Sequence, residues 1–75
     1  MNNTAAKPEI RQPDDFNLFG DPYWSWSSVR VNARVTVSDE DKVYVTGTDT
    51  GLDAYSASAL ADALASAHVW IAEHK

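Results

Sequence analysis

The sequence contains no cysteine, so neither a disulfide framework nor a thiolate metal site can stabilise the chain. Cations are also scarce, because six Lys and Arg stand against eleven Asp and Glu, giving a net charge of −5. Binding to a phosphate backbone requires clustered cations, so we expect no nucleic-acid partner. No apolar run approaches the ~20 residues of a membrane-spanning helix, and no signal-peptide core is evident. We therefore expect a cytoplasmic protein without a membrane partner.

Recognisable catalytic and metal-binding patterns are missing as well. The triplet Asp49-Thr50-Gly51 matches that of retroviral-type aspartic proteases, but it leads directly into a helical segment and the chain is too short for the flap of that fold. We interpret the triplet as a strand-to-helix connection. His68 and His74 do not share a helical face, and no nucleophile has a base beside it. We expect no enzyme, no cofactor, no metal and no small-molecule substrate.

The clearest periodic segment runs from Gly51 to Lys75 and predicts one long helix over residues ~54–73. Asp53 is a natural N-cap, alanine is abundant, and neither Pro nor Gly follows Gly51. At about 100° per residue, one stripe of this helix is predicted to face the core. The stripe comprises Ala57, Leu60, Leu64, Ala67, His68 and Ile71.

Residues 28–37 and 42–48 alternate between valine and polar residues, which predicts a β-hairpin with its valine face against the helix. The aromatic segment 16–26 is either a third strand or a segment that binds a partner. Residues 1–15 are polar and contain two prolines, so we expect a flexible arm followed by one domain of residues 16–75. The fold class is thus α+β: a hairpin, or three strands, packed on one C-terminal helix.

Several large or charged side chains have no evident cover within so short a chain. They belong to the aromatic segment, to the outer face of the hairpin, and to the helix away from its core stripe. We predict that they bind a protein partner, because aromatic and arginine side chains are common interface anchors. These residues are Trp24, Trp26, Arg30, Arg34, Tyr44 and Trp70.

The predicted strand Val29–Val37 is regular and free of proline, so its exposed edge favours pairing with a second chain. We expect a homodimer, because two-fold symmetry covers each such patch with its own copy. The alternative is that segment 16–26 folds back as a third strand and closes this edge within one chain.

The spacing of Ala57, Leu60, Ala61, Ala63 and Leu64 after a valine-rich hairpin resembles a pattern common in small, uncharacterised proteins of actinobacteria and their phages. The resemblance extends over roughly residues 35–72 and implies a non-enzymatic accessory protein, encoded by a phage, that binds and modulates a host protein. The alternative function is a homo-oligomeric structural or regulatory subunit of a virion or chromosomal complex.

Overall fold

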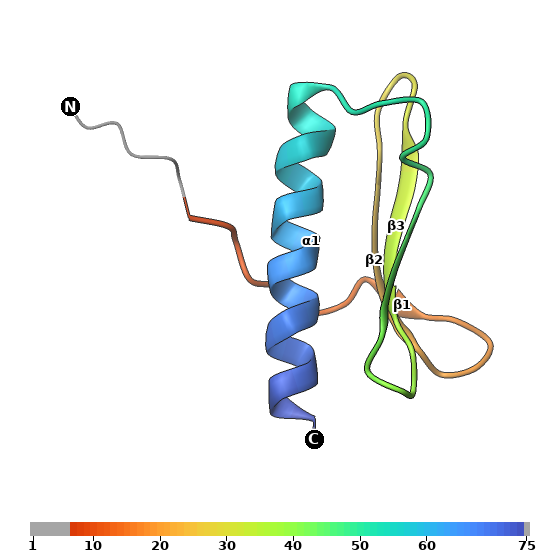
Figure 1. The fold of residues 1–75 in the computed structure, drawn as a ribbon, viewed down its shortest axis with the longest axis vertical. Helices are drawn as coiled ribbons and strands as arrows, with labels where there is room; N and C mark the ends of the chain where they lie inside the picture. Colours follow the sequence, from red (N-terminus) through yellow and green to blue (C-terminus); the bar gives the residue numbers. More distant parts are fainter. Residues whose placement is uncertain (1–6, 75) are drawn as a thin grey trace.

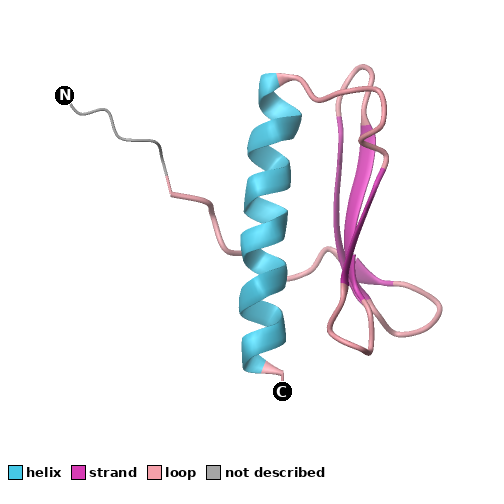
Figure 2. Cartoon of the chain, viewed as in Figure 1, coloured by secondary structure: helices cyan, strands magenta, loops and turns pink. Residues whose placement is uncertain are grey.

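A computed structural model describes residues 7–74, which form a four-stranded antiparallel sheet with one helix on one of its faces (Figures 1 and 2). In chain order the elements are β1 (Asp15–Phe16), β2 (Pro22–Ser27), β3 (Asn32–Val37), β4 (Val43–Thr46) and α1 (Ala54–Glu73). The strands lie side by side in the same order, so each one pairs with its neighbour in the sequence. The predicted α+β class is confirmed, with four strands in place of two or three.

Strand β2 is formed by the aromatic segment whose role was open. Trp24 and Trp26 point toward α1 and are buried, whereas Tyr23 lies half-buried on the outer face. This alternation of aromatic and small polar residues suits a strand that is covered on one side. Trp24 lies opposite Val35 of β3, so the segment is a third strand. It closes the edge of Val29–Val37 that we expected to form the dimer, and that expectation about β3 is wrong.

Strand β3 begins at Asn32, several residues later than predicted. The backbone N–H of Ser28 donates to the carbonyl of Val31 at 2.8 Å, and residues 28–31 turn the chain between β2 and β3. Val29, which was predicted to join the valine face, is 99% exposed in this loop. The alternating pattern continues through a turn that neither Gly nor Pro marks, so the sequence pattern did not reveal it.

Helix α1 has the predicted bounds, but a different face of it meets the sheet. The buried helix residues are Ser56, Ala63, Ser66 and Ala67, while Leu64 is 40% exposed and His68 is exposed. At 100° per residue, this face is rotated by about 90° from the predicted stripe. The physical reason is volume: two tryptophans from β2 fill the space beneath the helix, so only small side chains fit opposite them.

The core therefore lies between α1 and the two central strands, with its bulk supplied by the sheet. Its buried members are Trp24, Trp26, Val31, Ala33, Val35, Val37, Ala63 and Ala67. Helix residues Leu60 and Ile71 pack against it from the rim. The helix contacts β2 and β3 far more than β4, so β4 remains at an edge of the molecule.

Part of the segment of residues 1–15, for which a flexible arm was predicted, contacts the helix and the core. The backbone N–H of Glu9 donates to the Asp62 carboxylate at 2.8 Å, and that of Arg11 donates to the Ser66 hydroxyl at 3.0 Å. The indole N–H of Trp24 donates to the Arg11 carbonyl at 3.1 Å. These bonds attach residues 9–11 to α1 and to the core. Residues 1–6 of the predicted arm lie outside the described residues.

Candidate protein-interaction surface

The six residues predicted to bind a partner do not form one surface. Trp24 is fully buried and Trp26 is only 7% exposed, so both are core residues that a partner cannot contact in the folded chain. Trp70 is half-buried on α1, where its ring meets those of Phe16 and Trp24 edge-on at centroid distances of 5.9 and 6.4 Å. The His74 ring stacks on Trp70 at 3.6 Å. The tryptophans thus hold β1, β2 and α1 together.

Arg34 and Tyr44 do lie together, on the outer face of the sheet that α1 does not cover (Figure 1). Tyr44 pairs across the strands with Thr36, which in turn pairs with Tyr23. The Arg34 guanidinium lies 3.8 Å from the centre of the Tyr23 ring, in a cation–π contact. The side chains of this face therefore contact one another, and most of them are polar.

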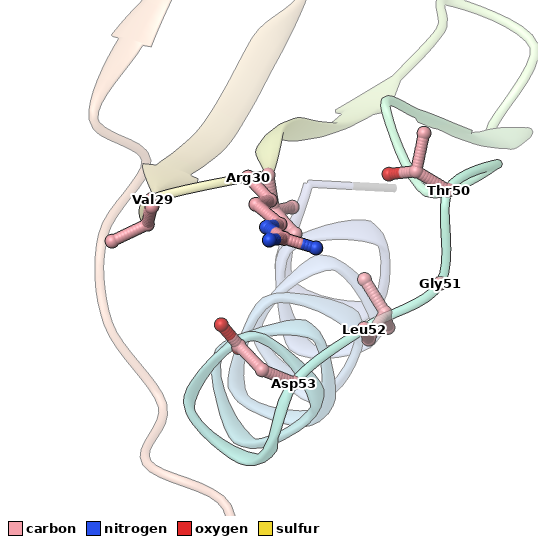
Figure 3. Close-up of a pocket in the computed structure, with 7 residues that line it drawn as sticks. Val29, Arg30, Thr50, Gly51, Leu52 and Asp53 are labelled. Carbon is pink, nitrogen blue, oxygen red and sulfur yellow. The ribbon is translucent and has the colours of Figure 1, made fainter.

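Arg30 lies apart from the others, in the β2–β3 loop. It borders an open pocket of about 400 Å³ between this loop and the start of α1, with Thr50 and Asp53 across from it (Figure 3). The N-terminus of a helix attracts anions, but here the carboxylate of Asp53 already occupies the free N–H group of Ser56. The pocket does not offer an anion site.

Asp53 fixes the start of α1 to the β2–β3 loop. Its Oδ1 accepts from the Ser56 N–H at 2.7 Å, and its Oδ2 accepts from the Ser28 hydroxyl at 3.1 Å. The hydrogen bond from the Ser56 backbone, helped by the Ser56 and Ser28 hydroxyls, lowers the pKa of the Asp53 carboxyl. The predicted N-cap is confirmed.

Because this pKa is lower in the folded than in the unfolded chain, the charged cap stabilises the fold above the unfolded value of about 3.9. The contribution is lost as the pH falls through the folded pKa. We expect Asp53→Ala to lower the melting temperature by a few degrees at about pH 7, and by less at about pH 3, which lies below the unfolded pKa, so that part of the contribution is already lost. Asp53→Asn retains an acceptor and should fall between the two proteins at neutral pH. Circular dichroism melts at both pH values measure this, and an Asp53→Ala deficit that persists at the lower pH would contradict it.

Two neighbouring large apolar side chains are almost fully exposed where no site residue was predicted, in the loop of residues 17–21 between β1 and β2. Leu18 is 101% exposed and Phe19 is 88% exposed. We call this loop the Leu18–Phe19 tip. In the sequence, its signal is an apolar pair between Asn17 and the turn residues Gly20-Asp21-Pro22.

The Leu18–Phe19 tip is held by hydrogen bonds of its own. The Asn17 side-chain oxygen accepts from the N–H groups of Phe19 at 2.9 Å and Asp21 at 3.0 Å. The Asn17 backbone N–H donates to the Asp21 carbonyl, and the Gly20 N–H donates to the Asn17 carbonyl. This Asx-type arrangement orders the backbone while leaving the two apolar side chains in water.

Acidic residues surround this end of the molecule. Asp15 and Asp21 flank the tip, and the β3–β4 turn, which carries Asp39, Glu40 and Asp41, lies at the same end of the sheet (Figure 1). Among residues 7–74 the ion pairs are Arg11 with Asp14 and, at 3.8 Å, Lys42 with Glu40. The other carboxylates of this end are left without a cation.

No family model, curated protein or solved structure matches the chain. Within the described part, no group of three acidic or histidine side chains is placed to hold a metal ion. No helix of residues 7–74 combines the length and apolarity needed to cross a membrane.

Proposed function

We propose that this protein is a non-enzymatic binding module that inserts the Leu18–Phe19 tip into an apolar pocket of a protein partner. The observation that carries the proposal is the nearly complete exposure of two large apolar side chains on a hydrogen-bonded loop. Burying each of them in a partner gains about 1.5–3 kcal/mol from the removal of apolar surface from water. Apolar anchors of this kind supply much of the binding energy of protein interfaces.

The hydrogen bonds within the loop support the same role. Asn17 already fixes the backbone of Phe19 and Asp21, so little backbone freedom remains to be lost on binding. A loop ordered before binding has a lower entropic cost of association than one that must fold on its partner.

The charge around the tip indicates the chemistry of the partner. Unpaired carboxylates such as Asp15 and Asp21 favour a pocket whose rim carries Lys or Arg, and they disfavour an anionic membrane surface. The resemblance of the helix segment to proteins of actinobacteria and their phages makes a cytoplasmic host protein the expected target, with this chain acting as a phage-encoded modulator.

A double variant at the tip tests the proposal. Leu18→Ser with Phe19→Ser should weaken binding by about 10²–10⁴-fold, from the loss of two buried apolar side chains. The melting temperature should stay nearly unchanged, because neither side chain contributes to the core. Affinity is measured by calorimetry with the purified partner, after its capture from host lysate with the wild-type chain.

Val29→Ser is the matched control, because Val29 is an apolar side chain of 99% exposure at the opposite end of the sheet. It should bind as the wild type does. Raising the salt concentration should slow association, since carboxylates and a cationic rim attract one another over about 10 Å. Equal affinity of the double variant and the wild type would refute the role of the tip.

A further inference from the structure

Strand β4 is a free edge of the sheet. Within the described chain it pairs with β3 on one side, and no strand lies on its other side. Its sequence, Val-Tyr-Val-Thr, contains neither the proline nor the charged residue that usually protects such an edge from pairing.

The backbone groups that point away from β3 can be identified from the turn that precedes β4. The N–H of Ser38 donates to the carbonyl of Lys42 at 2.9 Å, so this opposed pair is a hydrogen-bonded one. Such pairs alternate with non-bonded pairs along an antiparallel ladder. Tyr44 therefore bonds to β3, and the N–H and C=O groups of Val43 and Val45 point to the free edge.

The same two valines also have incompletely buried side chains. They lie opposite Val37 and Val35, on the sheet face that carries α1, yet each is 39% exposed because the helix packs over β2 and β3. Leu64 is 40% exposed on the flank of α1 opposite Asp62, the residue that binds the arm. Val43 and Val45 thus form a half-exposed apolar pair beside the unpaired edge, and Leu64 adds an exposed apolar side chain on the flank of α1 away from the arm.

We propose that a second copy of this chain pairs with the edge of β4, antiparallel and with its two-fold axis at Tyr44. The register follows from two requirements. Side chains opposite each other must lie on the same face, which restricts partners to residues of equal parity, and the bonded pairs must be those whose backbone groups point outward. Centring the axis on Tyr44 meets both requirements. It pairs Val43 with Val45 of the partner and Val45 with the partner's Val43, and it sets the two Tyr44 rings against each other.

The size of this surface suits a weak, reversible dimer. The exposed fractions of Val43, Tyr44, Val45 and Leu64 correspond to on the order of 300 Å² per copy, or ~600 Å² in total. This total lies below the range of stable interfaces, so we expect a dissociation constant of about 100 μM or above, with the backbone hydrogen bonds of Val43 and Val45 supplying the specificity. β4 itself carries no charge, but each chain carries −5, so added salt should strengthen the dimer.

Concentration-dependent mass is the first test. The wild type should shift from 8.2 kDa toward twice that mass as its concentration rises, in sedimentation equilibrium. Val45→Lys places a lysine of each copy at diagonal positions beside the axis, where the like charges repel, and should raise the dissociation constant by at least about 30-fold. Val29→Lys makes the same change in the β2–β3 loop, away from β4, where the side chain is 99% exposed. It should leave the dissociation constant within about twofold of the wild-type value.

The register has its own test, which does not depend on the folding of Val45→Lys. The chain has no cysteine, so Tyr44→Cys introduces one thiol per copy. At a non-bonded pair the opposed Cα atoms lie about 4.5 Å apart, within the range of a disulfide. Oxidised glutathione should link this variant into dimers, whereas Thr46→Cys, placed opposite Lys42 of the partner, should remain largely unlinked.

Amide hydrogen exchange on the wild type completes the design. Protection of the Val43 and Val45 N–H groups should rise with protein concentration. A single 8.2 kDa species at all concentrations would overturn the proposal, and so would efficient linkage of Thr46→Cys with none of Tyr44→Cys. Protection that appears only when a peptide of alternating apolar and polar residues is added would also overturn the proposal. It would show that the edge of β4 pairs with a strand of another protein.

Discussion

Replacing Trp24 with alanine is expected to lower the free energy of unfolding by about 3–5 kcal/mol, the range for large aromatic side chains removed from a core. Trp24 has no exposed surface, meets the Trp70 ring edge-on and donates its indole N–H to the Arg11 carbonyl. The substitution leaves a cavity at the centre of the sheet, and it leaves that carbonyl without its donor. A domain of this size has a total stability of only about 5–15 kcal/mol, so much of the variant should be unfolded at 37 °C. Urea unfolding followed by far-ultraviolet circular dichroism measures the loss.

Leu64→Ala is the informative comparison for Trp24→Ala. The sequence pattern places Leu64 in the core stripe, where its truncation would cost ~2–5 kcal/mol. In the structure Leu64 is 40% exposed, so we expect a loss of only about 1 kcal/mol. Both variants are best compared at sub-micromolar concentration, where pairing through β4 does not contribute. Equal losses for the two substitutions would mean that α1 presents a different face to the sheet.

Gly47→Ala should be comparably damaging, although it adds only one methyl group. Gly47 has φ of +82°, a conformation that costs a residue with a side chain about 1–2 kcal/mol. A Cβ atom at this position would overlap the carbonyl oxygen of Asn32 and would lie 2.9 Å from the Cα of Ala33. Both obstacles are β3 backbone, which cannot move aside as a flexible side chain does, so a further ~1–3 kcal/mol follows from overpacking. We expect a total loss of about 2–5 kcal/mol by urea unfolding.

Gly51→Ala separates the two causes. Gly51 also has a positive φ, of +88°, but a Cβ atom there would have no heavy atom within 4 Å. It should therefore lose only about 1 kcal/mol, from the backbone conformation alone. If Gly47→Ala and Gly51→Ala lowered the free energy of unfolding equally, the chain after β4 would not lie as close to the start of β3 as the structure shows.

Elements with strong local signals could be predicted from the sequence. The bounds of α1 and its Asp53 cap were predicted because capping and alanine content are properties of the helix itself. The face of the helix that meets the sheet was not predicted, because the side chains of the strands decide which helix residues are buried. Trp24 supplies the bulk from β2, and so it is Ala63 rather than Leu64 that fits beneath.

The candidate site was harder to predict for a related reason. Trp24 and Trp26 were predicted to be interface anchors because so short a chain offers little to cover them, yet β2 places both under α1. β1 has two residues, too few for any periodic pattern, so neither this strand nor the loop between β1 and β2 could be predicted from the sequence. Leu18 and Phe19 were therefore read as part of an aromatic segment, and their placement at a loop tip emerged only with the strands.

A helix that presents alanine and serine to a sheet lies close to it, and these small side chains also restrict how the helix can move along its own axis. Sliding by one turn, about 5.4 Å, would bring Leu60, Trp70 and Ile71 to the places of Ser56, Ser66 and Ala67, where the two tryptophans of β2 leave no room. Hydrogen bonds oppose the same movement. They are the bond of Ser28 to Asp53 at one end of α1, and the bonds of residues 9–11 to Asp62 and Ser66 near its middle. Side-chain volume and polar contacts thus select the same position of the helix, and a chain without these hydrogen bonds should keep α1 in its register.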